Sequence, residues 1–173
     1  MTEFETAIVA QNEIVDFMAE SPLYLRDLTP EMVQPYGIFL PTIPMLEPPH
    51  ADEDLWTVVQ ESWYVSKDGT VVHMQIGDKT DLASTPRIAK LMFGGAGRET
   101  PIAVVHDELY SQAGKRRYNI FTKEYWLPDQ KWCDVVFRDG SLLCKTNLFK
   151  AMTFYRALRM FGWIAWRNYR KIA

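Results

Sequence analysis

Three short segments carry the residue types that acid–base or metal-ion chemistry requires. They are residues 80–87 (TDLASTPR), residues 106–110 (HDELY) and the pair Cys133-Asp134. A histidine beside a carboxylate can act as a general base, because the carboxylate orients the imidazole and raises its basicity. Carboxylate oxygens that converge from two segments can instead bind a hard cation such as Ca²⁺ or Mg²⁺. The sequence therefore offers two kinds of chemistry in its middle part.

Helical spacing gives the residues of the middle segment different roles. In a helix, His106 and Tyr110 are four residues apart and share one face, whereas Asp107 is rotated away by about 100°. His106 can then meet an aspartate from a facing helix, and Asp134 is the candidate. Asp107 is available to bind a cation together with Asp81. We therefore expect a His106–Asp134 pair and an Asp81–Asp107 cation site.

Each of these patterns also has a purely structural interpretation. A helical histidine bonded to an aspartate can serve only to satisfy a buried polar group. Asp81 and Ser84 can cap a helix or close a turn before Pro86, and Arg87 can pair with a nearby carboxylate. The glycine-rich residues 94–97 lack the lysine and the serine or threonine of a phosphate-binding loop. The histidines and cysteines lack the spacing of zinc ligands, so a structural zinc site is not expected.

Periodicity and turn signals indicate the elements that must position these residues. Residues 55–65 and 70–76 are rich in β-branched and aromatic types and flank a Lys-Asp-Gly turn, which predicts a β-hairpin. A threonine-proline pair opens a predicted helix over residues 101–110. An aspartate caps a second predicted helix over residues 130–138, which a following Asp-Gly pair is expected to end.

The N-terminal part of the chain differs in composition from the rest. Residues 22–49 contain seven of the ten prolines, which disfavours regular helix and central strand. We expect residues 1–54 to form an extended, acidic, proline-rich arm and residues 55–173 to form one globular domain. The predicted fold class is α+β and mostly helical. It combines a small N-terminal hairpin, a helix pair that carries the His-Asp motif, and a long C-terminal amphipathic helix.

Charge is unevenly distributed along a chain whose formal net charge is −3. Residues 1–66 contain twelve acidic residues and one basic residue, whereas residues 141–173 contain seven basic residues and no acidic one. Asn147 can cap the last helix, which is expected to reach Lys171 and combines an aromatic face with neighbouring arginines. Opposite charges at the two ends favour head-to-tail self-association. The basic helix also suits a membrane surface, whereas the pI of about 5.6 argues against nucleic acid.

The bulk composition limits the expected cellular setting. No apolar run approaches the roughly 20 residues of a membrane-spanning helix, and the N-terminus lacks the basic-then-apolar pattern of a signal peptide. Cys133 and Cys144 are too few for a disulfide scaffold, and we expect both to be reduced thiols. These features predict a protein that is made and folded in a cytoplasm.

The order of the motifs resembles a phage and prophage family known as domain of unknown function 1353. The similar segments are TDLASTPR, AVVHDELY, the helical Asp134 and FYRALRMFGW, within about residues 56–166. The resemblance implies a phage origin, with synthesis in the host cytoplasm, and carries no established function. Together with the arm and the basic helix, it suggests a tail or junction protein of the virion that binds other virion proteins or itself.

A second, local resemblance supplies a chemical hypothesis. Calcium-dependent phospholipases of the A-two type carry His-Asp-x-x-Tyr on one helix and an aspartate on a facing helix. By this similarity His106 is the base that activates water, and Tyr110 and Asp134 hold it. Asp107 and Asp81 would be Ca²⁺ ligands, and the cation would polarise the ester carbonyl.

The bacterial and fungal branch of those enzymes also has an Asp-x-x-Ser-x-Pro loop upstream, which resembles residues 81–86. Ser84 and Arg87 are therefore supporting candidates. Two functions follow from the sequence. One is a phage-encoded, metal-assisted hydrolase of ester, lipid or cell-envelope substrates with His106 as general base. The alternative is a structural virion component that uses the arm and the basic helix for assembly, without catalysis.

Overall fold

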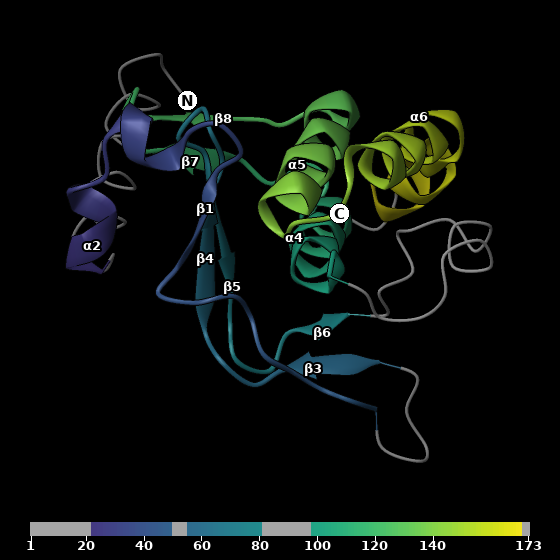
Figure 1. Cartoon of the computed structure of the whole chain (residues 1–173). Helices are drawn as coiled ribbons and strands as arrows, with labels where there is room; N and C mark the ends of the chain where they lie inside the picture. The colour runs from purple at the N-terminus through teal and green to yellow at the C-terminus, as the bar shows by residue number, and fades with distance from the viewer. Residues whose placement is uncertain (1–21, 50–54, 81–97, 171–173) are drawn as a thin grey trace, which may run out of the picture.

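A computed structural model of the chain describes residues 22–49, 55–80 and 98–170 (Figure 1). In chain order, the helical elements are α2 (Leu23–Arg26), the 3₁₀ turn η1 (Pro30–Val33), α4 (Thr100–Ser111), α5 (Gln130–Leu143) and α6 (Leu148–Arg170). The strands are β1 (Ile38–Leu40), β2 (Leu46–Glu47), β3 (Trp56–Val58), β4 (Ser62–Val65), β5 (Val71–Met74), β6 (Lys79–Thr80), β7 (Arg117–Asn119) and β8 (Glu124–Trp126).

The described residues contain a much larger β component than the sequence suggested. Their eight strands pair into three sheets, with the orders β1-β4-β5, β2-β3-β6 and β7-β8. The prediction of a mostly helical fold with one small hairpin was therefore wrong, because the fold is a mixture of α and β. These strands are only two to four residues long, so they are too short for a period of two to stand out in the sequence.

The hairpin around Lys67-Asp68-Gly69 is present, but its first half is divided between two sheets. β4 and β5 pair antiparallel with Trp63 opposite His73. Gly69 has a φ of +90°, which favours glycine at this turn. The residues that were expected to form one long strand instead form β3 and β4, and β3 pairs with β2 and β6. β4 is the central strand of its sheet, and all four of its residues are buried.

The proline-rich segment is part of the sheets, which corrects the expectation of an extended arm. β1 pairs with β4 and places Phe39 opposite Tyr64, while β2 pairs with β3. The prolines lie outside these strands: β1 is between Pro35 and Pro41, and β2 is between Pro44 and Pro48. Proline cannot donate a ladder hydrogen bond, so the prolines limit the strands to three and two residues without preventing them.

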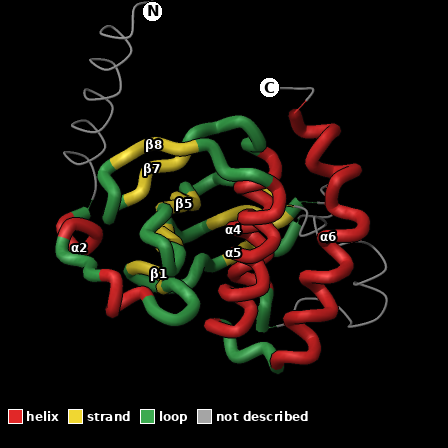
Figure 2. Tube along the Cα trace, turned by 90° about the horizontal axis from the view of Figure 1, so that it is seen from above, coloured by secondary structure: helices red, strands yellow, loops and turns green. Residues whose placement is uncertain are grey.

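Three helices pack beside the sheets and form the larger part of the core. α4 contacts β5 on one side and both α5 and α6 on the others, so it is buried almost all round (Figures 1 and 2). Its start at Thr100, with proline in the first turn, confirms the predicted helix. Asp129 accepts a hydrogen bond from the backbone N–H of Trp132 and Asn147 from that of Lys150, which confirms both predicted caps.

α5 continues to Leu143, five residues beyond the predicted end. Gly140 is not a helix stop. It allows α5 and α4 to pack closely, since a Cβ at this position would collide with the side chain of Ile102 on α4. Gly162 has a similar role on α6, where a Cβ would lie 2.7 Å from Oη of Tyr110. Among the helices that the structure describes, none is both long enough and apolar enough to cross a membrane.

Candidate functional site

Asp134 is the centre of a buried polar cluster between α4, α5 and α6. Its Oδ1 accepts a hydrogen bond from Tyr110 Oη at 2.6 Å and lies 3.2 Å from His106 Nε2. Its Oδ2 accepts a hydrogen bond from Nη1 of Arg159 at 2.8 Å. The side chain of Asp134 is 0% exposed and that of His106 is 1% exposed. The structure thus brings together the three residues that were the catalytic candidates of the sequence, and adds Arg159.

Aromatic side chains hold the imidazole ring of His106 in place. The ring of Tyr110 lies 4.1 Å from it, centroid to centroid, and Phe137 meets it edge-on at 5.2 Å. Because Nε2 faces the carboxylate of Asp134, the proton of a neutral imidazole is best placed on Nε2. The lone pair then belongs to Nδ1, which is the atom that could accept a proton from another molecule.

The electrostatics of the cluster favour a protonated Tyr110. Burial raises the pKa of Tyr110, and the adjacent charge of Asp134 raises this pKa further, so the phenol remains a hydrogen-bond donor. The hydrogen bond to Asp134 also raises the pKa of Arg159. A buried carboxylate needs a compensating charge, and the guanidinium, whose side chain is 36% exposed, supplies it from the surface.

Arg159 was not singled out as a site residue from the sequence. It is one of several arginines beside the aromatic face of the last helix, and its spacing does not distinguish it from Arg156 or Arg167. One feature of the sequence could have indicated Arg159: it directly follows Leu158, which is buried, and so lies at the edge of the helix face that packs into the core. Only the crossing of α6 over α5 places its guanidinium against Asp134.

Asp107 lies on another side of α4, as the helical spacing predicts. It is buried, and the hydroxyl of Thr80 donates a hydrogen bond to its Oδ2. Asp107 and Thr80 line a pocket of about 260 Å³ together with Glu108 and Asp78. Burial raises the pKa of Glu108, although the nearby charge of Arg117 opposes this shift. The lining of this pocket combines carboxyl and hydroxyl oxygens with the amine of Lys79 and with several apolar side chains.

The predicted cation site lies only partly within the described residues. Asp81, Ser84 and Arg87 lie outside them. Thr80, which contacts Asp107, directly precedes Asp81 in the sequence. Among the residues that the structure does describe, no group of three or more His, Cys, Asp or Glu side chains is arranged to hold a metal ion. Of the two predicted cation ligands, Asp107 lies within the described residues and Asp81 does not.

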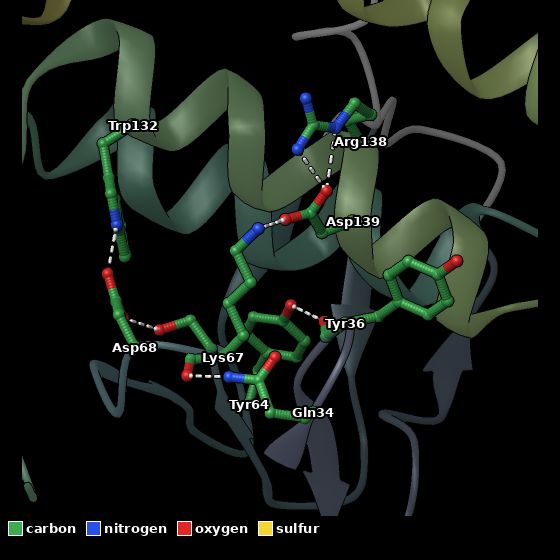
Figure 3. Close-up of polar contacts among 9 residues, drawn as sticks. Gln34, Tyr36, Tyr64, Lys67, Asp68, Trp132, Arg138 and Asp139 are labelled. Carbon is green, nitrogen blue, oxygen red and sulfur yellow. Dashed lines mark hydrogen bonds and ion pairs between the residues drawn. The ribbon is translucent and has the colours of Figure 1, made fainter. Parts of the chain in front are cut away.

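A second buried carboxylate of α5, Asp139, belongs to a separate polar cluster (Figure 3). Its Oδ2 lies 2.8 Å from Nζ of Lys67, in the β4–β5 turn, and its Oδ1 pairs with the guanidinium of Arg138. The same turn is held by Asp68, which accepts a hydrogen bond from the indole N–H of Trp132. These contacts attach the turn to α5.

The segment before β1 closes the other side of this cluster. The amide of Gln34 donates to the backbone carbonyl of Lys67, and the Tyr64 hydroxyl donates to the backbone carbonyl of Tyr36 (Figure 3). An open groove of about 730 Å³ lies above these residues. The sequence did not predict this cluster, because its members are up to about a hundred positions apart and share no motif.

The two cysteines are free thiols in the structure. Burial raises the pKa of Cys144 to about 11 and also raises that of Cys133, which directly precedes Asp134. A thiol with a raised pKa is protonated near neutral pH and is a poor nucleophile. Within the described residues, the chemistry of the site therefore depends on His106 and the carboxylates.

Fold and site together define a class: a mixed α and β protein in which three helices enclose a histidine–aspartate–tyrosine cluster. A family model described as "Protein of unknown function (DUF1353)" matches residues 56–158, and the chain belongs to this family. The matched span includes His106, Tyr110 and Asp134 and ends one residue before Arg159. No curated protein and no solved structure matches the chain.

Proposed function

We propose that this chain is a phage-encoded hydrolase of ester or lipid substrates that uses His106 as its general base. One observation carries the proposal. The carboxylate oxygen of Asp134 that accepts the Tyr110 hydroxyl also lies 3.2 Å from His106 Nε2, so the imidazole is oriented by a carboxylate that is itself held. This is the relationship that the resemblance to the calcium-dependent phospholipases implies for these residues.

In this proposal each residue of the cluster has a definite task. Asp134 accepts a hydrogen bond from the Nε2–H of His106 and stabilises the imidazolium that forms when Nδ1 takes a proton from water. Tyr110 and Arg159 hold the carboxylate and compensate its charge. Asp107 would hold Ca²⁺, which when bound supplies Lewis-acid polarisation of the ester carbonyl. Because His106 is 1% exposed, Nδ1 must become accessible when substrate binds.

The test is hydrolysis of phospholipid vesicles and of soluble esters, with Ca²⁺ and with a chelator, by wild type and two histidine variants. We expect His106→Asn to lower the rate by about 10²-fold or more, which is the usual contribution of a general base. His73→Asn is the matched control, because His73 pairs with Glu61 and stacks on Trp63, away from Asp134. Its rate should equal that of wild type.

Two outcomes would contradict the hydrolase proposal. One is the absence of hydrolysis on the whole panel by a protein whose thermal unfolding shows that it is folded. The other is hydrolysis that His106→Asn leaves unchanged. Asp107→Asn separates the cation from the base, because it should abolish the stimulation by Ca²⁺ while the cluster around Asp134 stays intact.

A second candidate function has its own supporting observation. The buried His106 is sealed between α4 and α5, and Asp134 contacts three donor groups, as in a cluster that only stabilises a core. We propose as the alternative that the chain is a virion component that binds other virion proteins, without catalysis. Mass spectrometry of purified particles tests it: the chain should be present in a constant number of copies per particle.

A further inference from the structure

α6 is apolar on the side that packs against the domain and also on the side that faces solvent. The buried side carries Ala151, Phe154, Leu158, Gly162 and Trp166, at the three- and four-residue spacing of one helix face. In the C-terminal half of α6, four large apolar residues point outward instead. They are Met160, Phe161, Trp163 and Ile164, which are 59%, 44%, 48% and 50% exposed. We call these four residues the outer α6 face.

The outer α6 face forms one patch because its members are neighbours on the helix. Met160 is three residues from Trp163 and four from Ile164, and Phe161 is three from Ile164, so their side chains can touch. Large exposed apolar patches mark surfaces that bind a partner, since burying such area is favourable by about 25 cal/mol per Å². A helix that is apolar on two opposite sides is expected to be covered on both.

All the charged residues of α6 are basic. Arg156 and Arg167 are exposed beside the outer α6 face, and the guanidinium of Arg167 lies over the ring of Trp163, 5.4 Å from its centre. Residues 141–173 contain seven basic residues and no acidic one. A partner that fits this surface must therefore combine apolar side chains with negative charge.

The chain itself contains such a segment at its other end. Residues 1–20 include five acidic residues and no basic one, and large apolar residues alternate with them. The acidic residues are Glu3, Glu5, Glu13, Asp16 and Glu20, and the large apolar residues after Met1 are Phe4, Ile8, Val9, Ile14, Val15, Phe17 and Met18. Both the sign of the charge and the apolar content of this acidic head complement the outer α6 face.

The arrangement of the fold favours a contact between two copies. α2, which begins two residues after Ser21, and α6 lie at opposite sides of the molecule in both views (Figures 1 and 2). We propose that the outer α6 face of one copy binds the acidic head, residues 1–20, of a second copy. This inference rests on the proposed assembly function and specifies its partner. A head-to-tail contact of this kind repeats and produces rings or open chains of subunits.

The experiment is sedimentation of the full chain over a range of concentrations, with two charge-reversed variants. The head variant carries Glu3→Lys, Glu5→Lys, Glu13→Lys and Asp16→Lys, and the face variant carries Arg156→Glu and Arg167→Glu. We expect wild type to form oligomers whose association weakens about tenfold or more at high salt, because screening removes the attraction. Each variant alone should be a monomer, since its head and its face carry the same sign.

Mixing the two variants is the decisive measurement. In an equimolar mixture every head meets a face of opposite sign on the other variant, so oligomers should form again. A contact within one chain cannot be restored by mixing. Ile76→Gln is the matched control, because Ile76 is 69% exposed in the turn between β5 and β6. Its oligomers should equal those of wild type.

Three results would overturn the proposal: a wild type that is monomeric at all concentrations, variants that still associate alone, or a mixture that does not associate. Co-sedimentation of a monomeric wild type with phosphatidylglycerol vesicles would assign the outer α6 face to a membrane instead. The protein composition of purified particles distinguishes failure of the head-to-tail contact from failure of the assembly function. A chain that is found in purified particles but does not self-associate refutes the head-to-tail contact and leaves the assembly function standing.

Discussion

α5 carries two buried aspartates, Asp134 and Asp139, whose surroundings are opposite in kind. The two residues are five positions apart, which turns them about 140° from each other around the helix. Asp134 faces α4 and α6, where the phenol of Tyr110 and the imidazole of His106 meet one oxygen. Asp139 faces the β4–β5 turn, where Lys67 and Arg138 reach it from the surface (Figure 3).

The difference shows what a buried carboxylate can be used for. Asp139 bridges two cations that remain partly in water, so it fastens a turn to a helix. Asp134 is fully enclosed, and the charge that compensates it comes from Arg159, while its other oxygen orients a titratable ring. The same residue type on the same helix is therefore structural at one position and suited to acid–base chemistry at the other.

The largest effect should follow from Asp134→Ala. Removing this carboxylate leaves the Tyr110 hydroxyl and the His106 imidazole inside the core without their shared acceptor, whereas Arg159 can turn to water. Each buried polar group left without a partner typically costs about 1 to 3 kcal/mol, so we expect a loss of about 2 to 6 kcal/mol. Urea unfolding monitored by tryptophan fluorescence measures the loss. A cost of about 1.5 kcal/mol or less, the value expected for Asp139→Ala, would mean that the two clusters contribute equally to stability.

Tyr110→Phe should cost less, about 2 kcal/mol, because it removes one hydrogen bond to a charged acceptor. The comparison comes from Tyr64→Phe, on the Asp139 side of the molecule. The hydroxyl of Tyr64 donates to a neutral carbonyl, that of Tyr36, at 2.7 Å. Its loss should cost about 1 kcal/mol in the same unfolding measurement. Equal costs would contradict a charged Asp134.

Asp139→Ala should destabilise the protein by about 1.5 kcal/mol, clearly less than Asp134→Ala. The reason is that Lys67, whose side chain is 41% exposed, and Arg138 can turn to water once their shared carboxylate is gone. Thermal unfolding of the two alanine variants side by side provides the measurement. If Asp139→Ala is the more damaging of the two, the contrast between the two clusters fails.

The smallest effect is expected for Lys67→Met, about 0.5 kcal/mol, as for most exposed ion pairs. Arg138 still contacts Asp139 in this variant, so the carboxylate keeps one cation. Screening should reduce the difference from wild type further at about 1 M salt, which repeated urea titrations can detect. A larger and salt-independent effect would show that Lys67 stabilises the turn through packing.

Local signals predicted the helices well because helix starts and caps depend on neighbouring residues. The proline after Thr100 and the capping side chains of Asp129 and Asn147 are all used as expected. The spacing within HDELY also predicted that His106 and Tyr110 share a face, and both contact Asp134. These features involve residues within four positions of each other, together with one assumption about a facing helix.

Pairings between distant segments could not be predicted in the same way. β1 forms because it pairs with β4, and β2 forms because it pairs with β3, although the prolines on both sides of each disfavour a strand there. Gly140 seemed to be a helix stop and is instead a contact point with Ile102. In both cases a tertiary partner outweighs a local preference that is worth only about 1 kcal/mol per residue.

The sequence by itself determined where α4, α5 and α6 begin, the common face of His106 and Tyr110, and the opposite charges of the two ends. Those properties follow from backbone geometry and composition, which need no distant partner. The tertiary structure decided that the buried imidazole of His106 and the guanidinium of Arg159 contact Asp134, while cations from the surface contact Asp139. The physical reason is burial: the same carboxylate differs in role according to which donors the packing of α4, α6 and the β4–β5 turn brings to it.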